Sequence, residues 1–67
     1  MKTARFPAID SQWVLEEPAG WVRLVVVGIE RHPGQEPRVY AHRAGKRRTL
    51  RRFHLGYFQK WAKQVRA

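Results

Sequence analysis

Alternating hydrophobic and polar residues predict a β-hairpin over residues 12–30, QWVLEEPAGWVRLVVVGIE. Pro18 suits the first central position of a type I turn, and Gly20 can take the left-handed conformation that follows it. This chemistry predicts a three-residue loop with a bulge. Residues 21–29 are apolar on both faces, which is typical of a central strand. The two prolines and the glycine of RHPGQEP (31–37) then indicate a loop.

A second hairpin is predicted from RVYAHR (38–43) and RRTLRR (47–52). Gly45 fits the first central position of a tight type II′ turn between them. The resulting register pairs Ala41 with Leu50 toward the core. On the other face it pairs Tyr40 with Arg51. That outward face would display Tyr40, His42, Arg47, Thr49 and Arg51, whereas Arg48 and Arg52 would flank Leu50 at the rim of the core.

The last apolar segment, LGYFQKWAKQV (55–65), has helical spacing. One face of this helix would carry Leu55, Phe58, Trp61, Ala62 and Val65. An alternative is one long helix over residues 46–65, in which the arginines would form a single stripe. Gly56 would cost that long helix about 1 kcal/mol relative to alanine. A strand followed by a helix accounts better for Gly45 as a turn and Gly56 as a junction.

These elements predict an α+β domain, built as a small antiparallel sheet or an SH3-like barrel of about four strands with a C-terminal amphipathic helix. The 67 residues are enough for one small domain, which we place at residues 11–67. Residues 1–10 would form a flexible N-terminal arm, with Phe6 pinned to the core. The large aromatic side chains are expected to fill the core: Trp13, Trp21, Phe53, Phe58 and Trp61.

Charge is distributed unevenly along the chain. All five acidic residues lie within residues 1–36, and residues 37–67 contain ten basic residues and no acid. The formal net charge is +9. Such asymmetry favours an acidic partner, most often nucleic acid. The other interpretation is that the charge serves only to keep a small protein soluble.

The second hairpin concentrates the residues that suit nucleic acid. Guanidinium groups bind phosphate bidentately, and an aromatic ring among them can stack on a base. The predicted binding residues are Tyr40, His42, Arg43, Lys46, Arg47, Arg48, Arg51 and Arg52. We therefore expect a non-enzymatic module that binds DNA or RNA. The alternative is a protein-interaction module, or small regulator, that docks on an acidic surface with Trp21 or the helix as its hot spot.

Other chemistries find little support in the sequence. The chain has no cysteine, and His32, His42 and His54 lack the spacing of metal ligands, so no metal, cofactor or catalytic site is predicted. MKTARFPAID lacks the apolar stretch of a signal peptide, and LVVVGI is too short to span a bilayer. We expect a cytoplasmic protein that binds no membrane. It would be a monomer, or a homodimer formed through a strand edge.

Across residues 12–66 the order of features is W13…G20…V22…V26…V39…L50…F53…F58…V65. This order resembles short, basic, mostly uncharacterised proteins encoded by prophages and other mobile elements, some of which have SH3-like barrels. The resemblance implies an accessory role near DNA, transcription or a host protein. It implies no particular functional residues.

Overall fold

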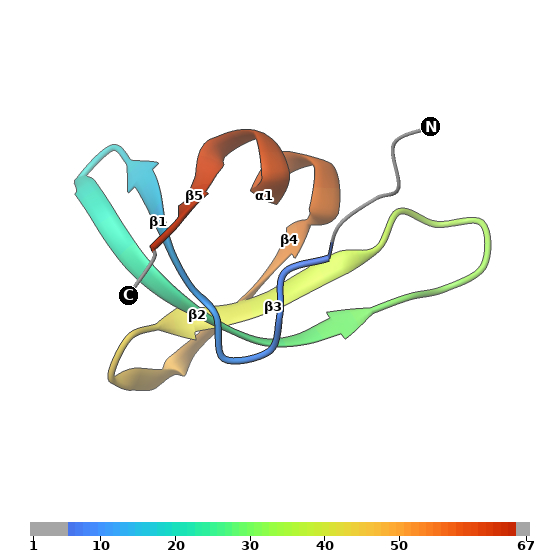
Figure 1. Ribbon diagram of the computed structural model, residues 1–67, viewed down its shortest axis with the longest axis horizontal. Coiled ribbons are helices and arrows are strands. Elements are labelled where there is room, and N and C mark those ends of the chain that lie inside the picture. The colour runs from blue at the N-terminus through green and yellow to red at the C-terminus, as the bar shows by residue number, and fades with distance from the viewer. Residues whose placement is uncertain (1–5, 66–67) are drawn as a thin grey trace.

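The computed structural model describes residues 6–65, which form one antiparallel sheet of five strands and a short helix (Figure 1). The elements in chain order are β1 (Gln12–Glu17), β2 (Gly20–Glu30), β3 (Arg38–Arg43), β4 (Lys46–His54), α1 (Leu55–Trp61) and β5 (Ala62–Gln64). Their spatial order is β4-β3-β2-β1-β5, so β4 and β5 are the edge strands. The prediction of a small α+β domain is confirmed.

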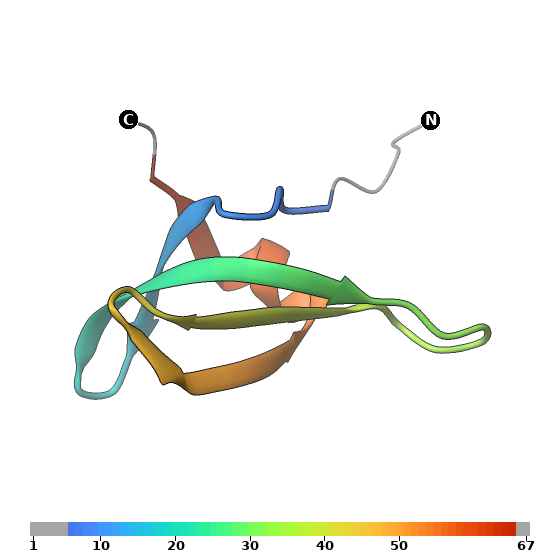
Figure 2. The same cartoon turned by 90° about the horizontal axis from the view of Figure 1, so that it is seen from below.

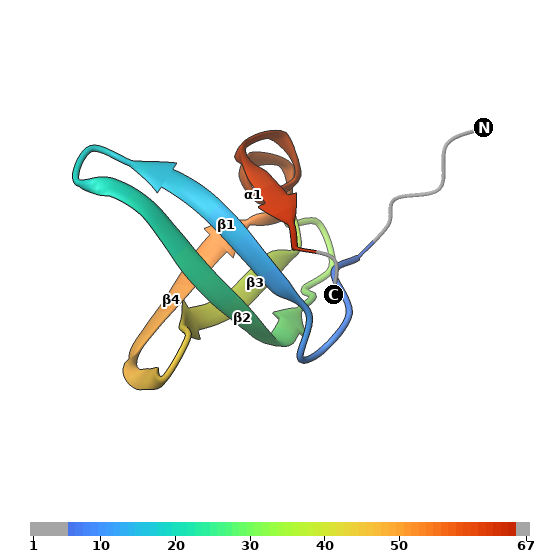
Figure 3. The same cartoon turned by 60° about the vertical axis from the view of Figure 1, so that its left-hand side comes forward.

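The sheet is strongly bent. Figure 3 shows the β1–β2 hairpin crossing the β3–β4 hairpin, with α1 at one end of the resulting curve. The segment before β1 is tied to β2, because the Asp10 amide donates to the Val26 carbonyl oxygen at 2.8 Å. Figure 2 shows this segment and α1 on the same side of β2 and β3. Both therefore help to cover the concave face of the sheet.

The hydrophobic core lies between this concave face and α1. Its buried side chains are Leu15, Leu24, Val26, Val39, Ala41, Phe53, Leu55, Phe58 and Ala62. Phe58 joins the layers, since its ring centroid lies 5.1 Å from that of Trp13 and 5.8 Å from that of Phe53. Phe6 also packs against the core, as the sequence predicted, with the Arg31 guanidinium carbon 3.9 Å from its ring centroid. Residues 1–5 of the expected arm lie outside the described residues.

The first hairpin closes with a tighter turn than expected. Glu17 pairs with Gly20, so the turn contains two residues instead of three. Gly20 does take a positive φ, of 123°. β2 is central, as predicted, but only its core face is buried: Trp21 is 58% exposed on the other face. A bulge between Val26 and Gly28 shifts the alternation of β2, and the strand continues beside β3 to Glu30.

β3 has the predicted bounds, but its register with β4 differs from the prediction. Ala41 lies opposite Arg51 and Tyr40 opposite Arg52, one residue away from the expected pairs. A slip of one residue moves side chains to the opposite face of a sheet. Leu50 is accordingly 52% exposed instead of buried. The faces predicted for Arg51 and Arg52 are therefore wrong, because Arg51 lies opposite buried Ala41 and Arg52 lies opposite Tyr40.

The turn of the second hairpin explains this slip. Arg43 pairs with Lys46, which places Gly45 at the second central position, where its φ is 77°. The predicted type II′ turn, with Gly45 first, is wrong. Between the Arg43–Lys46 and Ala41–Arg51 pairs, β3 contributes one residue and β4 contributes four. The surplus residues form an irregular segment at 47–50 that the sequence pattern did not reveal.

The C-terminal segment contains a shorter helix than predicted. α1 ends at Trp61 because Ala62 is extended, and residues 62–64 add β5 alongside β1. The long-helix alternative is wrong, since residues 46–54 form a strand. Trp61 is 55% exposed, so its assignment to the core is also wrong. Within residues 6–65, no helix has the length and apolarity needed to cross a membrane.

Candidate nucleic-acid interface

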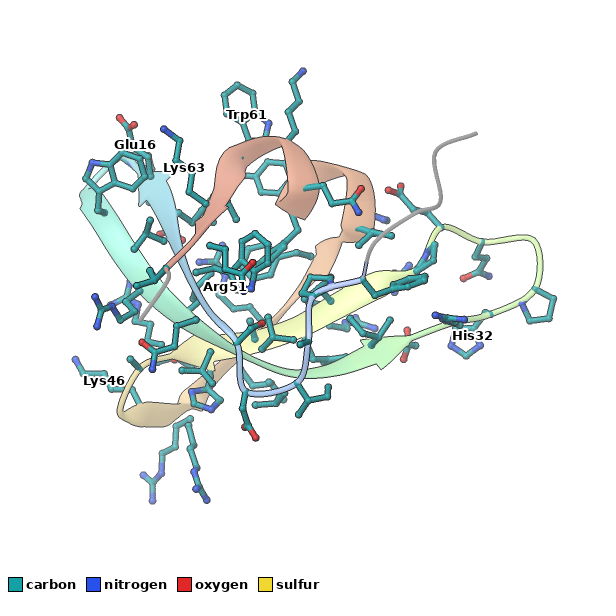
Figure 4. The ribbon with its side chains drawn as sticks, in the orientation of Figure 1. Glu16, His32, Lys46, Arg51, Trp61 and Lys63 are labelled. Atoms are coloured by element: carbon teal, nitrogen blue, oxygen red, sulfur yellow. The ribbon has the colours of Figure 1, made fainter. Side chains whose placement is uncertain are left out.

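The turn end of the second hairpin gathers four cations: Arg43, Lys46, Arg47 and Arg48. We call this set the hairpin tip. All four side chains are exposed, and Figure 4 shows Lys46 at the end of the hairpin. Thr49 shapes the irregular segment, because its Oγ1 accepts from the Arg43 amide at 2.8 Å and donates to the Lys46 carbonyl at 2.7 Å. Hydrogen bonds from Thr49 thus hold the turn together, and the four cations of the tip extend into solvent.

The cations of the hairpin tip stand without ion-paired acids in the part of the chain that the structure describes. Among residues 6–65, none of its four cations forms an ion pair with a carboxylate. Arg23 of β2 adds a fifth cation, because it lines a shallow hollow of about 240 Å³ with Trp21, Arg43 and Lys46. Arg23 is not among the binding residues predicted from the sequence. Pairing of its neighbour Leu24 with Arg43 brings it close, and that register could not be read from the sequence.

A second hollow, of about 780 Å³, opens beside the tip on the convex face. Its lining includes Arg47 and His42 together with the exposed side chains Val27 and Leu50. The His42 Nδ1 lies 2.8 Å from the Arg43 carbonyl oxygen, so Nδ1 must carry the proton that this oxygen accepts. The lining of this hollow therefore combines apolar surface with positive charge, and it also includes the acidic residue Asp10.

The opposite end of the hairpin carries Arg38, Tyr40, Arg52 and His54, a set we call the hairpin base. Arg38 faces His54 across the two strands, and Tyr40 faces Arg52. Arg38, Arg52 and His54 line a hollow of about 270 Å³. Of this set, only Tyr40 and Arg52 are predicted from the sequence as binding residues, because the predicted register does not pair Arg38 with His54.

Acidic residues accompany the hairpin base. The Tyr40 hydroxyl donates to Glu30 Oε2 at 2.6 Å, and Glu30 lies opposite Arg38. His54 Nδ1 lies 3.6 Å from Glu36 Oε1. The hydrogen bond from Tyr40 is the main cause that lowers the pKa of Glu30; burial opposes it, and His32 and Arg38 add smaller lowering effects. Glu30 therefore stays ionised beside these cations.

Arg51 lies apart from the outward-facing arginines. It sits opposite buried Ala41, on the core side of β4, and its guanidinium group donates to Glu17 of β1. The same group lies 4.9 Å from the ring centroid of Phe53. Figure 4 shows Arg51 within the curve of the sheet. The predicted outward face with Arg47 and Arg51 side by side is thus wrong, and Arg51 instead connects two distant strands.

No group of three or more histidine, aspartate or glutamate side chains in the described part of the chain could hold a metal ion. Comparisons with protein-family models, curated proteins and solved structures found no match to this chain. The resemblance to prophage and mobile-element proteins therefore stays a prediction.

Proposed function

We propose that this protein is a small, non-enzymatic nucleic-acid-binding module. Its phosphate contacts come from the hairpin tip and Arg23, with Arg52 in support. One observation carries the proposal: within residues 6–65, the tip cations lack carboxylate partners, whereas Arg51 of the same hairpin is paired with Glu17. Arginine offers planar donors that match phosphate oxygens, and exposed arginines can adapt to them without first breaking an ion pair.

The overall charge supports the same function. A net charge of +9 on 67 residues attracts polyanions over several ångströms and raises the rate of encounter. Phosphate contacts release bound counterions, so the affinity should fall steeply with salt. Such a module would read sequence weakly, because phosphates carry no sequence information. We place it in the cytoplasm, where it would meet DNA or RNA.

We further propose that the bent sheet is a partly open, SH3-like barrel. Its two edge strands, β4 and β5, are joined directly through α1, which contacts both of them. The helix thereby covers the gap between the edges. Exposed edges in so small a sheet need such covering.

Fluorescence anisotropy with labelled single-stranded DNA, duplex DNA and RNA at several salt concentrations tests the function. With five phosphate contacts, from the four tip cations and Arg23, the slope of log affinity against log salt should be roughly −3.5 for a single strand and −4.5 for a duplex. We expect micromolar or tighter binding near physiological salt. Weak binding that disappears equally for all three ligands would leave the charge with a role in solubility alone.

The competing function, docking on an acidic protein surface, draws on the exposed tryptophans Trp21 and Trp61. A pull-down from nuclease-treated lysate separates the two. A stoichiometric protein that survives nuclease treatment would favour docking, and loss of all bound material would favour nucleic acid.

A further inference from the structure

A fourth hollow, which we call the aromatic cleft, lies where α1 and β5 meet the β1–β2 hairpin. Its volume is about 650 Å³, within the usual range of ligand sites. It is lined by Glu16, Trp21, Tyr57, Lys60, Trp61 and Lys63. Figure 4 shows Glu16, Trp61 and Lys63 at the same end of the molecule. The predicted binding site contained none of these residues.

The aromatic rings of the cleft are not needed to close the core. Trp21, Tyr57 and Trp61 are 58%, 48% and 55% exposed. Tyr57 stacks on buried Phe53, with ring centroids 6.3 Å apart and an interplanar angle of 4°, which fixes the plane of its ring. Three large aromatic side chains exposed in one cleft of a small domain indicate a surface that binds something.

Positive charge surrounds these rings. Lys60 and Lys63 outnumber the single acid, Glu16, among the lining residues. The Lys60 ammonium lies 5.3 Å from the ring centroid of Trp61. Aromatic rings with neighbouring cations suit nucleotides, whose bases stack while their phosphates meet the cations. An acidic, aromatic-poor partner would leave the rings without contacts.

Trp21 connects this cleft to the hairpin tip. It lines the aromatic cleft on one side and, on the other, the hollow shared with Arg23, Arg43 and Lys46. The two binding surfaces are therefore neighbours along one edge of the molecule. A strand whose phosphates lie on the tip could continue directly onto the exposed rings.

We propose that the aromatic cleft stacks unpaired bases, so that the preferred ligand is single-stranded nucleic acid. This inference rests on the proposed function, since it adds base stacking to phosphate binding at the tip. A duplex cannot use the cleft without unstacking, because its base faces already contact one another. Single strands should thus bind more tightly than duplexes of the same length.

The test compares an oligothymidylate with a strand of abasic sites of the same length. The thymidylate should bind about five- to 100-fold more tightly, as expected for one or two stacked bases. It should also quench tryptophan fluorescence. Trp13 is partly buried and donates its indole N–H to Ser11 Oγ at 2.8 Å, so the quenching should come from Trp21 and Trp61.

Three variants make the test specific. Trp61→Ala should remove most of the preference for bases, and Trp61→Phe should retain much of it by preserving a stacking ring. Ile9→Ala, which truncates another 55% exposed apolar side chain outside the cleft, should change nothing. Circular dichroism and thermal unfolding verify that each variant folds.

The outcomes separate this inference from the proposed function. Equal affinity for both strands, unaffected by Trp61→Ala, would overturn base stacking and leave phosphate binding intact. Failure of both strands to bind would overturn both proposals. A protein captured from nuclease-treated lysate by the wild type and lost with Trp61→Ala, without any preference for bases, would assign the cleft to a protein partner.

Discussion

Both ends of the β3–β4 hairpin are positively charged, with four cations at the tip and two arginines and a histidine at the base, but they differ in what surrounds the charge. At the hairpin base, Tyr40 is bonded to Glu30 and His54 lies near Glu36. At the hairpin tip, no cation has a carboxylate partner within residues 6–65. Arg38 and Arg52 of the base form no ion pair within residues 6–65 either, so the two ends differ in the acids that lie beside the base, Glu30 and Glu36, and not in ion-paired arginines.

This difference shows why the number of arginines is a poor guide to a binding surface. Arg51 belongs to the run GKRRTLRRF, yet it is bonded to Glu17 on the core side of the sheet. Breaking such a pair to free its charge would offset part of any gain from binding phosphate. Each cation therefore has to be judged by its partners in the folded chain.

Charge reversal should give the largest difference between the two ends in their contribution to nucleic-acid affinity. Arg47→Glu with Arg48→Glu should weaken nucleic-acid binding by about 100-fold and reduce the magnitude of the salt slope by about 1.4 for a single strand. Thermal stability should hardly change, because both side chains are exposed. Anisotropy titrations at several salt concentrations measure both quantities. The matched control, Arg38→Glu with Arg52→Glu, should weaken binding several-fold less; equal losses would contradict the contrast between tip and base.

Glu36 should affect folding instead of binding. Its Oε2 accepts from the Gly56 amide at 2.6 Å, in the first turn of α1, and thus acts as a cap supplied by a distant loop. Glu36→Ala should lower the free energy of unfolding by about 1 kcal/mol, as for the loss of a helix cap. Urea denaturation measures this change, with Gln35→Ala as the neighbouring control. A gain of affinity for nucleic acid without a loss of stability would indicate that the base binds nucleic acid directly, because the substitution removes a negative charge beside His54.

Glu17→Gln should release the Arg51 guanidinium group from its ion pair and leave it available to bind phosphate. The change removes one negative charge and the ion pair, so affinity should rise about two- to threefold at low salt and the gain should shrink at high salt. Lower affinity than the wild type would mean that the Glu17 pair helps to shape the binding surface.

Tyr40→Phe should have the smallest effect of these substitutions, and that effect should be on the dependence of stability on pH. Glu30 has a lowered pKa, so it contributes stability that is complete above the ordinary carboxyl pKa of about 4.3 and is lost as pH falls through the lowered value. Removing the Tyr40 hydroxyl should raise the pKa of Glu30 and flatten the acid limb of stability against pH. Carboxyl chemical shifts followed by NMR during an acid titration test this. An unchanged Glu30 titration would contradict the assigned cause.

Much of the fold could be predicted from local patterns. RVYAHR gave the bounds of β3, and the turn residues placed both hairpins at the correct point in the chain. β5 contains three residues, too few to show a periodic pattern, and it is defined only by its pairing with β1. Its existence depends on tertiary contacts that no local pattern encodes.

The candidate site was harder to predict because it depends on register. Leu50 is apolar and looked like a core residue, but the irregular segment turned it toward solvent. Trp21 and Trp61 looked like core residues because of their size, and both are exposed. Residue type suggested most of the cations that we propose for phosphate binding, whereas the surplus residues in β4 decide which way they point.

The irregular segment of β4 has a further consequence for the behaviour of the protein in concentrated solution. β4 is an edge strand, and regular edges invite pairing with other chains into aggregates. Here the interrupted ladder and the flanking arginines obstruct such pairing. Replacing these arginines with neutral, β-prone residues would therefore expose the edge as well as remove charge. Glutamate substitutions keep the edge repulsive and are the safer way to separate binding from self-association.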